Sequence, residues 1–293
     1  MPVARSKDAE SWPERCRARL AGALRTSASR FPALGHDNEA SIHAARRALK
    51  EARALMRFLA RAGDLDLDRP MRGLDQARAA LATARDFDVM ASALGDLREA
   101  TSPRTADAFA RSIEARREAA RIQPIDARRN IAALRRAASQ IDDLDLSSLK
   151  ARDLSVALRA LWRRARRRGE RAFESADAGH LHRARVAMVE LGAVIEMFRP
   201  EESRALAAAT RDLRKLRAML GVHNDLDVLK GFARGVGLTK PEAEAVERWA
   251  RERQKPLRRR ARRRFEEAFL ERPHALVRRL ADTIEQRSGR RHG

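Results

Sequence analysis

Residues 41–58 have the sequence SIHAARRALKEARALMRF, in which apolar and basic residues recur with the period of an α-helix. Wound as a helix, the segment has Ile42, Leu49 and Met56 on one side. Its basic residues fall within an arc of about 120° on the other side. These residues are His43, Arg46, Arg47, Lys50, Arg53 and Arg57. The segment therefore predicts an amphipathic helix that buries an apolar stripe and exposes a stripe of positive charge.

The positive stripe has two interpretations. A solvated helix face is the simpler one, but such faces usually mix charges of both signs as i, i+4 pairs. Like charges at this spacing repel each other by roughly 0.2–0.5 kcal/mol per pair. Within the segment only Glu51 is acidic, and it points to the side of the stripe. The pattern therefore favours a bound anion whose charges repeat along its length. His43 at the head of the stripe is either a packed or capping residue or part of that site.

The same pattern recurs 139 residues later, where His182 aligns with His43 and Arg185 with Arg46. The alignment continues without a gap for more than forty residues. It also pairs Leu74 with Leu213, Arg78 with Arg217, Leu81 with Leu220, Asp86 with Asp225, Asp88 with Asp227 and Val89 with Val228. A repeat of this length predicts two related structural units, residues 9–146 and 148–289. We expect an all-α fold of two helical bundles related by a pseudo-twofold axis, with a concave surface between them.

Helix-favouring Ala, Leu, Arg and Glu dominate the rest of the chain. Turn residues separate twelve predicted helices, at 11–28, 39–62, 70–83, 86–100, 104–121, 125–140, 152–173, 178–198, 201–219, 223–235, 241–271 and 273–287. The acidic, turn-rich segment 142–148 is the predicted boundary between the two units. We expect residues 1–8 to form a disordered N-terminus and residues 288–293 to be frayed.

The charge of the chain is strongly positive. Its 63 Lys and Arg residues, 56 of them Arg, against 41 Asp and Glu give a formal net charge of +22. Because Arg pairs bidentately with phosphate oxygens, this bias predicts an anionic partner. With no Tyr, nine Phe and three Trp, the chain has few aromatic rings for stacking single-stranded bases.

The sequence has a single cysteine, Cys16, and no run of 18 apolar residues. A disulfide framework and a membrane span are therefore not expected. The first eight residues also lack the apolar stretch of a signal peptide. We expect a cytoplasmic protein that has no membrane partner.

Two acidic segments follow predicted helices, Arg85-Asp86-Phe87-Asp88-Val89 and Asn224-Asp225-Leu226-Asp227-Val228. An Asp at the start of a helix accepts hydrogen bonds from the free N–H groups and suits the helix dipole. A helix start with an inter-helix ion pair is the favoured interpretation, and a Mg²⁺ or Ca²⁺ site is the alternative. Two carboxylates are too few for Ca²⁺. His180 and His182 point apart on a helix and do not form a ligand pair. No metal site or cofactor is predicted.

On these residues the chain resembles the family of conserved histidine α-helical domains, called CHAD. The family pattern is His-x-x-Arg with Lys at +7 and Arg at +10, followed later by Arg-Asp-x-Asp-Val. The first half meets it with His43, Arg46, Lys50, Arg53 and residues 85–89, and the second half with His182, Arg185, Glu196, Phe198 and residues 220–228. The resemblance covers nearly the whole chain. It implies two helical bundles with a basic central groove or pore, which binds inorganic polyphosphate and targets polyphosphate granules without catalysis.

The second half departs from this pattern, because Val189 and Gly192 stand where Lys and Arg are expected. The Arg-rich segments 159–168 and 258–264 are possible sources of compensating charge. The expected polyphosphate-binding residues are His43, Arg46, Arg47, Lys50, Arg53, Arg57, Arg85, Arg163, Arg167, His182, Arg183 and Arg185.

Three other functions are alternatives to polyphosphate binding. Any protein of charge +22 is expected to bind nucleic acid non-specifically at low salt, so a nucleoid or RNA-binding protein is the main alternative. An enzyme is not expected, because the sequence has no P-loop, no nucleophile with a base and no carboxylate cluster for two metals. An interaction scaffold that docks acidic partners on its Arg-rich outer faces remains open.

Overall fold

The computed structural model describes residues 11–31, 39–121, 126–175, 177–197, 204–235 and 237–270, together with 275 and 278. All regular secondary structure in these residues is helical. The ten helices are α1 (Trp12–Arg30), α2 (Glu39–Gly63), α3 (Asp68–Ala80), α4 (Ala82–Ala100), α5 (Pro103–Arg121), α6 (Ala127–Asp142), α7 (Ala151–Glu174), α8 (Ala178–Met197), α9 (Arg204–Gly235) and α10 (Lys240–Ala268). The all-α fold class predicted from the sequence is confirmed.

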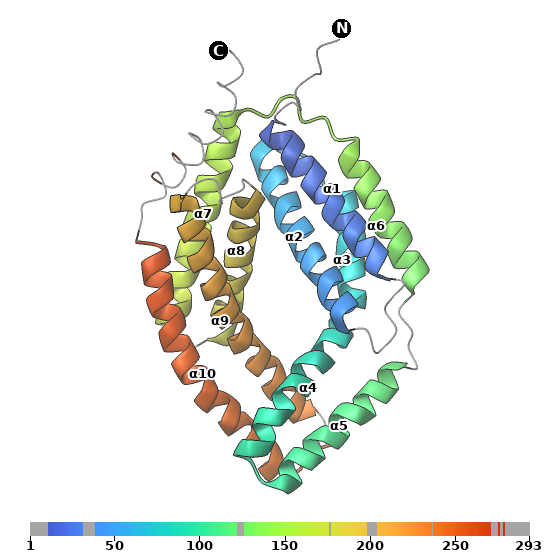
Figure 1. The fold of residues 1–293 in the computed structure, drawn as a ribbon, viewed down its shortest axis with the longest axis vertical. Helices are drawn as coiled ribbons and strands as arrows, with labels where there is room; N and C mark the ends of the chain where they lie inside the picture. The colour runs from blue at the N-terminus through green and yellow to red at the C-terminus, as the bar shows by residue number, and fades with distance from the viewer. Residues whose placement is uncertain are drawn as a thin grey trace.

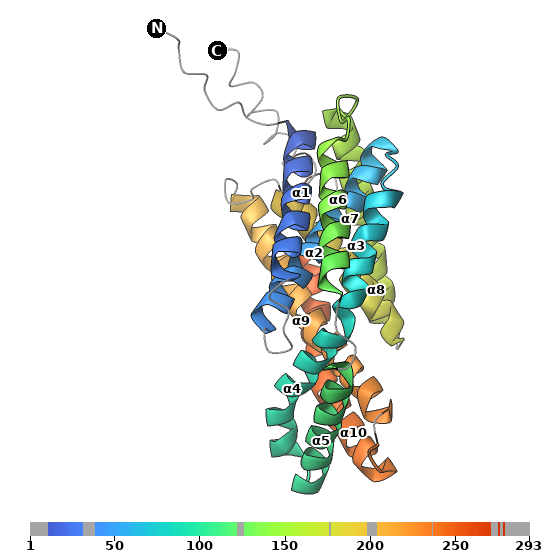
Figure 2. The same cartoon turned by 90° about the vertical axis from the view of Figure 1, so that its right-hand side faces the viewer.

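The helices form two arms that meet along α2 and α8 and again at the lower end of the molecule (Figure 1). One arm contains α1, α2, α3 and α6, in which α1 packs on α2 and α6, and α3 packs on α6. The other arm contains α7, α8, α9 and α10, and each of these helices packs on the next one along the chain. Helix α10 also contacts α7. Helices α4 and α5 cross below and meet the lower ends of α9 and α10 (Figure 2).

The main differences from the predicted helix boundaries are in two places. The predicted helices 201–219 and 223–235 are one helix, α9, which continues through Gly221 because that glycine has no positive φ and Leu220 is buried in the core. Helix α4 begins at Ala82 rather than at residue 86. Both acidic segments therefore lie inside helices, and the expectation that they start helices is wrong. Of the predicted helix 273–287 only residues 275 and 278 are described, both as helical, and the two predicted frayed ends fall outside the described ranges.

Two hydrophobic cores hold the described helices together. The larger one is formed mainly by α1, α2, α3, α6, α7, α8 and α9 and includes Trp12, Phe58 and Trp162. The smaller one lies between α4, α5, α9 and α10 around Phe109. Cys16 is fully buried in the larger core, and burial raises the pKa of its thiol well above the ordinary value. Cys16 is therefore a packing residue, because its reactive thiolate form is suppressed.

Two helical glycines provide a test of this packing. A Cβ at Gly169 on α7 would lie 2.5 Å from Cζ of Phe265 on α10, whereas a Cβ at Gly22 on α1 would meet nothing within 4 Å. Ala is favoured over Gly in a helix by about 1 kcal/mol, and overpacking a core costs about 1–3 kcal/mol. We expect Gly22→Ala to raise the free energy of unfolding by up to about 1 kcal/mol and Gly169→Ala to lower it by about 1–2 kcal/mol. Urea denaturation followed by circular dichroism measures both, and equal stabilisation by the two substitutions would contradict the close α7–α10 contact.

Across the described residues, no helix combines the length and the apolar composition needed to cross a lipid bilayer.

Candidate functional site

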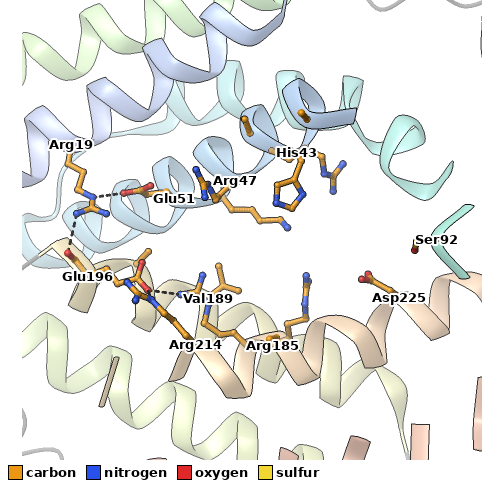
Figure 3. Close-up of a pocket in the computed structure, with 17 residues that line it drawn as sticks. Arg19, His43, Arg47, Glu51, Ser92, Arg185, Val189, Glu196, Arg214 and Asp225 are labelled. Atoms are coloured by element: carbon orange, nitrogen blue, oxygen red, sulfur yellow. Dashed lines mark hydrogen bonds and ion pairs between the residues drawn. The ribbon is translucent and has the colours of Figure 1, made fainter. Parts of the chain in front are cut away.

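A basic cavity of about 1290 Å³ lies between α2 on one side and α8 and α9 on the other, with Arg19 of α1 and Ser92 of α4 at its margins. Its basic residues are His43, Arg46, Arg47, Lys50, Arg19, Arg185, Arg214 and Arg217. Its acidic residues are Glu51, Glu196 and Asp225. Figure 3 shows His43 and Arg47 facing Arg185 and Val189 across the cavity. We refer to this space as the basic cavity.

The first half of the α2 stripe forms one wall of the basic cavity. Nη1 of Arg46 donates a hydrogen bond of 2.5 Å to the carbonyl oxygen of Leu81, which ties α2 to the junction of α3 and α4. His43 and Arg47 are exposed and make no hydrogen bond or ion pair with any other described residue. Their polar atoms face the cavity in Figure 3 and are available to a ligand.

The second half of the stripe does not line the cavity. Nε of Arg53 donates to Asp75 of α3 at 3.0 Å, and Nη1 of Arg57 donates to Glu190 of α8 at 2.5 Å. Glu190 is 4% exposed and also accepts from Arg164 of α7 at 2.9 Å. Farther along α2, the stripe therefore meets the neighbouring helices, where its arginines join α2 to α3, α7 and α8.

The opposite wall draws its charge mostly from α9. Arg214 and Arg217 line the cavity, and both donate to Oε1 of Glu196, at 3.0 and 3.3 Å. Burial is the main cause that lowers the pKa of Arg217, and Glu196 opposes it. An Arg side chain stays protonated even so, because its ordinary pKa lies above 12.

Gly192 makes room for this arrangement. A Cβ at Gly192 would lie only 2.5 Å from Nη1 of Arg217, so the missing side chain on α8 leaves space for the guanidinium from α9. Helix α8 has no basic residue at positions 189 and 192, and Arg214 and Arg217 of α9 supply positive charge to this wall instead. The Arg-rich segments 159–168 and 258–264, which the sequence offered as sources of charge, contribute no residue to the cavity lining.

An ion-pair network closes one end of the cavity. Arg19 of α1 pairs with Glu51 of α2, and its Nη1 donates to the carbonyl oxygen of Glu196 at 3.1 Å. Figure 3 shows this network at one end of the cavity and Ser92 and Asp225 at the other. Glu51 and Glu196 are therefore paired with arginines of the lining, and the eight basic against three acidic residues leave the cavity positive.

Of the remaining residues predicted for the site, those whose side chains the structure describes lie outside the cavity. Arg163 and Arg167 are exposed on α7. Nδ1 of His182 makes a hydrogen bond of 2.8 Å with Oδ1 of Asn224, and Arg183 pairs with Asp177 at 3.4 Å. Arg85 lies in α4, but its side chain is outside the described part of the structure. Of the twelve predicted residues, the structure brings together five in the cavity, namely His43, Arg46, Arg47, Lys50 and Arg185.

Three arginines of the lining were missed by the sequence analysis: Arg19, Arg214 and Arg217. Arg217 carried a usable signal, because it aligns with Arg78 in the repeat. Arg214 aligns with an acidic residue, Asp75, and Arg19 belongs to a helix whose basic residues show no single stripe. For these two only the tertiary contacts reveal the position.

The second acidic segment divides its two carboxylates between different sites. Asp225 lines the basic cavity, whereas Asp227 accepts from Lys230 at 2.7 Å and from Gln254 of α10 at 2.8 Å. Burial raises the pKa of Asp227, but hydrogen bonds from His223, Lys230 and Gln254 outweigh it and hold the pKa well below its usual range. Asp227 therefore joins α9 to α10. The described residues contain no group of three or more His, Cys, Asp or Glu side chains that could hold a metal ion.

Comparison with known proteins identifies the family to which this chain belongs. Residues 18–234 match the model of the CHAD domain. The chain therefore belongs to the CHAD domain family. The crystal structure of the CHAD domain from the plant Ricinus communis has the same fold, with a TM-score of 0.61 and 20% sequence identity over 96% of this chain and 95% of that one. A comparison with curated protein sequences gave no match.

Proposed function

We propose that the protein binds inorganic polyphosphate in the basic cavity. The observation that carries the proposal is the presence of Arg and Lys side chains on two facing walls, one from α2 and one from α8 and α9. A linear polyanion presents phosphates in every direction around its axis. A cavity that is basic on two sides neutralises such a chain better than one basic helix face does.

Binding requires no chemical step. The guanidinium groups of Arg47, Arg185 and Arg214 each donate hydrogen bonds to phosphate oxygens, and Lys50 adds a compact positive charge. His43 adds a hydrogen-bond donor from its imidazole ring. The proposed role is non-catalytic, because holding the polymer requires only positive charge and hydrogen-bond donors.

We also propose that the two repeats predicted from the sequence are related by a pseudo-twofold axis. Helices α1 and α7 begin at residues 12 and 151, and α2 and α8 begin at residues 39 and 178, so both pairs start 139 residues apart. The packing of α1 on α2 corresponds to that of α7 on α8. These correspondences support two repeats related by a pseudo-twofold axis, with the basic cavity between their second helices. We further propose that the protein acts in the cytoplasm at polyphosphate granules.

Non-specific nucleic-acid binding is the second candidate, because part of the positive charge lies outside the cavity. Exposed arginines continue over the outer faces of α7 and α10: Arg163, Arg166, Arg167, Arg171, Arg259, Arg260, Arg262 and Arg263. A duplex would bind to these outer faces through its phosphates.

A competition experiment distinguishes the two candidates. We expect long-chain polyphosphate to bind at least about tenfold more tightly than double-stranded DNA of matched charge, at about 150 mM salt. Fluorescence anisotropy with either labelled polymer measures this, with and without Mg²⁺. Equal affinities would mean that the charge of +22 acts generically and would contradict the cavity as the principal site.

A further inference from the structure

A second hollow, of about 400 Å³, adjoins the basic cavity between α4, α9 and α10. Ser92 and Asp225 line both spaces, so the two adjoin each other at the end of the cavity opposite the Arg19–Glu51 pair (Figure 3). The hollow therefore lies next to one end of a ligand placed along the basic cavity. We refer to the hollow as the side pocket.

The side pocket has a different chemistry from the basic cavity. Its walls include Val222, Leu226, Leu229 and Leu257, and Val222 is 51% exposed. Trp249 of α10 lines it as well and is partly buried. An apolar pocket next to a phosphate-binding space suits a ligand that carries an apolar group on a chain of phosphates.

The aromatic residue of the pocket is held in a fixed arrangement. The guanidinium carbon of Arg253 lies 5.2 Å from the centre of the Trp249 ring, and Arg253 also pairs with Asp96 of α4. Indole rings and guanidinium planes are the surfaces on which nucleobases stack in proteins. The lining of the pocket thus combines the stacked planar groups of Trp249 and Arg253 with the polar groups of Asp96 and Ser92.

We propose that the side pocket binds the base of a nucleoside 5′-polyphosphate whose phosphate chain lies in the basic cavity. This inference deepens the proposed function and rests on it. The base lies against Trp249 and Arg253, and the ribose lies at the junction of the two spaces beside Ser92 and Asp225.

Asp225 supplies the polar contact that a ribose requires. A carboxylate accepts hydrogen bonds from ribose hydroxyls in dinucleotide-binding proteins, and its two oxygens have about four acceptor positions. Asp225 is therefore able to accept from a ribose in addition to its contacts within the protein. A carboxylate repels phosphate, so its position at the mouth of the basic cavity fits a sugar better than the next phosphate of an inorganic chain.

The test compares ATP with inorganic tripolyphosphate, both without divalent metal, by isothermal titration calorimetry and intrinsic fluorescence. ATP carries no more charge than tripolyphosphate, so tighter binding of ATP cannot come from charge. We expect ATP to bind about tenfold more tightly and to change the tryptophan emission. Trp12 and Trp162 are 4% and 1% exposed, so such a change reports on Trp249.

Two substitutions localise the effect. Ala93→Phe fills the side pocket from α4, and Trp249→Leu removes the ring while keeping an apolar side chain. Both are expected to abolish the advantage of ATP and to leave the affinity for tripolyphosphate within about twofold. Ala160→Phe, at an exposed position on α7, is the matched control and should change neither. Trp249→Leu keeps the test valid if Ala93→Phe does not fold.

The outcomes separate this inference from the proposed function. If tripolyphosphate binds and ATP binds no more tightly, the side pocket is not a base site, while the polyphosphate proposal stands. If ATP keeps its advantage in both variants, the base binds elsewhere and the inference is wrong. If neither ligand nor long-chain polyphosphate binds, the proposed function itself fails.

Discussion

Arg47→Glu combined with Arg214→Glu is expected to weaken polyphosphate binding by on the order of 100-fold at about 150 mM salt. The two residues lie on facing walls of the basic cavity, and both side chains are exposed enough to be replaced without opening the core. Each loses a charge-assisted hydrogen bond, worth about 1.5–3 kcal/mol, and each new carboxylate repels the phosphates. Fewer counterions are released when fewer phosphates are neutralised, so the dependence of affinity on salt should also become weaker.

The control has the same change in charge outside the cavity. Arg163→Glu combined with Arg167→Glu alters two exposed residues of α7 that the sequence had assigned to the site. We expect this variant to lose no more than about threefold in polyphosphate affinity. At this salt concentration the Debye length is roughly 8 Å, so charges on the outer face of α7 act only weakly on a ligand in the cavity. The affinity for DNA should fall more in the Arg163→Glu, Arg167→Glu variant than in the Arg47→Glu, Arg214→Glu variant. Equal losses of polyphosphate affinity in the two variants would overturn the cavity as the binding site.

Glu190→Ala is expected to lower the free energy of unfolding by about 3 kcal/mol, because it leaves two guanidiniums without their carboxylate. The side chain of Glu190 is 5% exposed and pairs with Arg57 and Arg164, which are 28% and 23% exposed. Glu190 also opposes the lowering of pKa that burial and Arg164 impose on Arg61 and Arg168. The single carboxylate of Glu190 thus stabilises the charged form of four arginines where α2, α7 and α8 meet. The partial exposure of the arginines sets the expected loss at the lower end of the range for buried pairs.

Two further variants control for this effect, measured by urea denaturation. Glu190→Gln keeps the size of the side chain and a hydrogen-bond acceptor, so its loss should fall below that of Glu190→Ala. Asp142→Ala breaks the exposed pair with Arg25, in which the Arg25 and Asp142 side chains are 57% and 40% exposed, and should change stability by less than about 1 kcal/mol. A loss of similar size for Asp142→Ala and Glu190→Ala would show that burial of Glu190 adds nothing.

The sequence by itself determined the helical nature of the chain and the first wall of the cavity. The helical period of residues 41–58 separates the apolar from the basic residues, because neighbours at i+3 and i+4 share one face whatever the tertiary structure is. His43, Arg46, Arg47 and Lys50 were found in this way and do line the cavity. Arg185 followed from the repeat. The helix boundaries predicted at the acidic segments were wrong, because a helix continues where packing supports it.

Only the tertiary structure decided which positive charges face the cavity and which hold helices together. The helical period places Arg53 and Arg57 on the same face as Lys50, but it cannot say that both pair with carboxylates of other helices. The helical period also cannot show that the guanidinium of Arg217 occupies the space beside Gly192 where a side chain would otherwise lie. The physical reason is that an arginine side chain reaches far from its backbone, so its partner depends on which helix lies beside it.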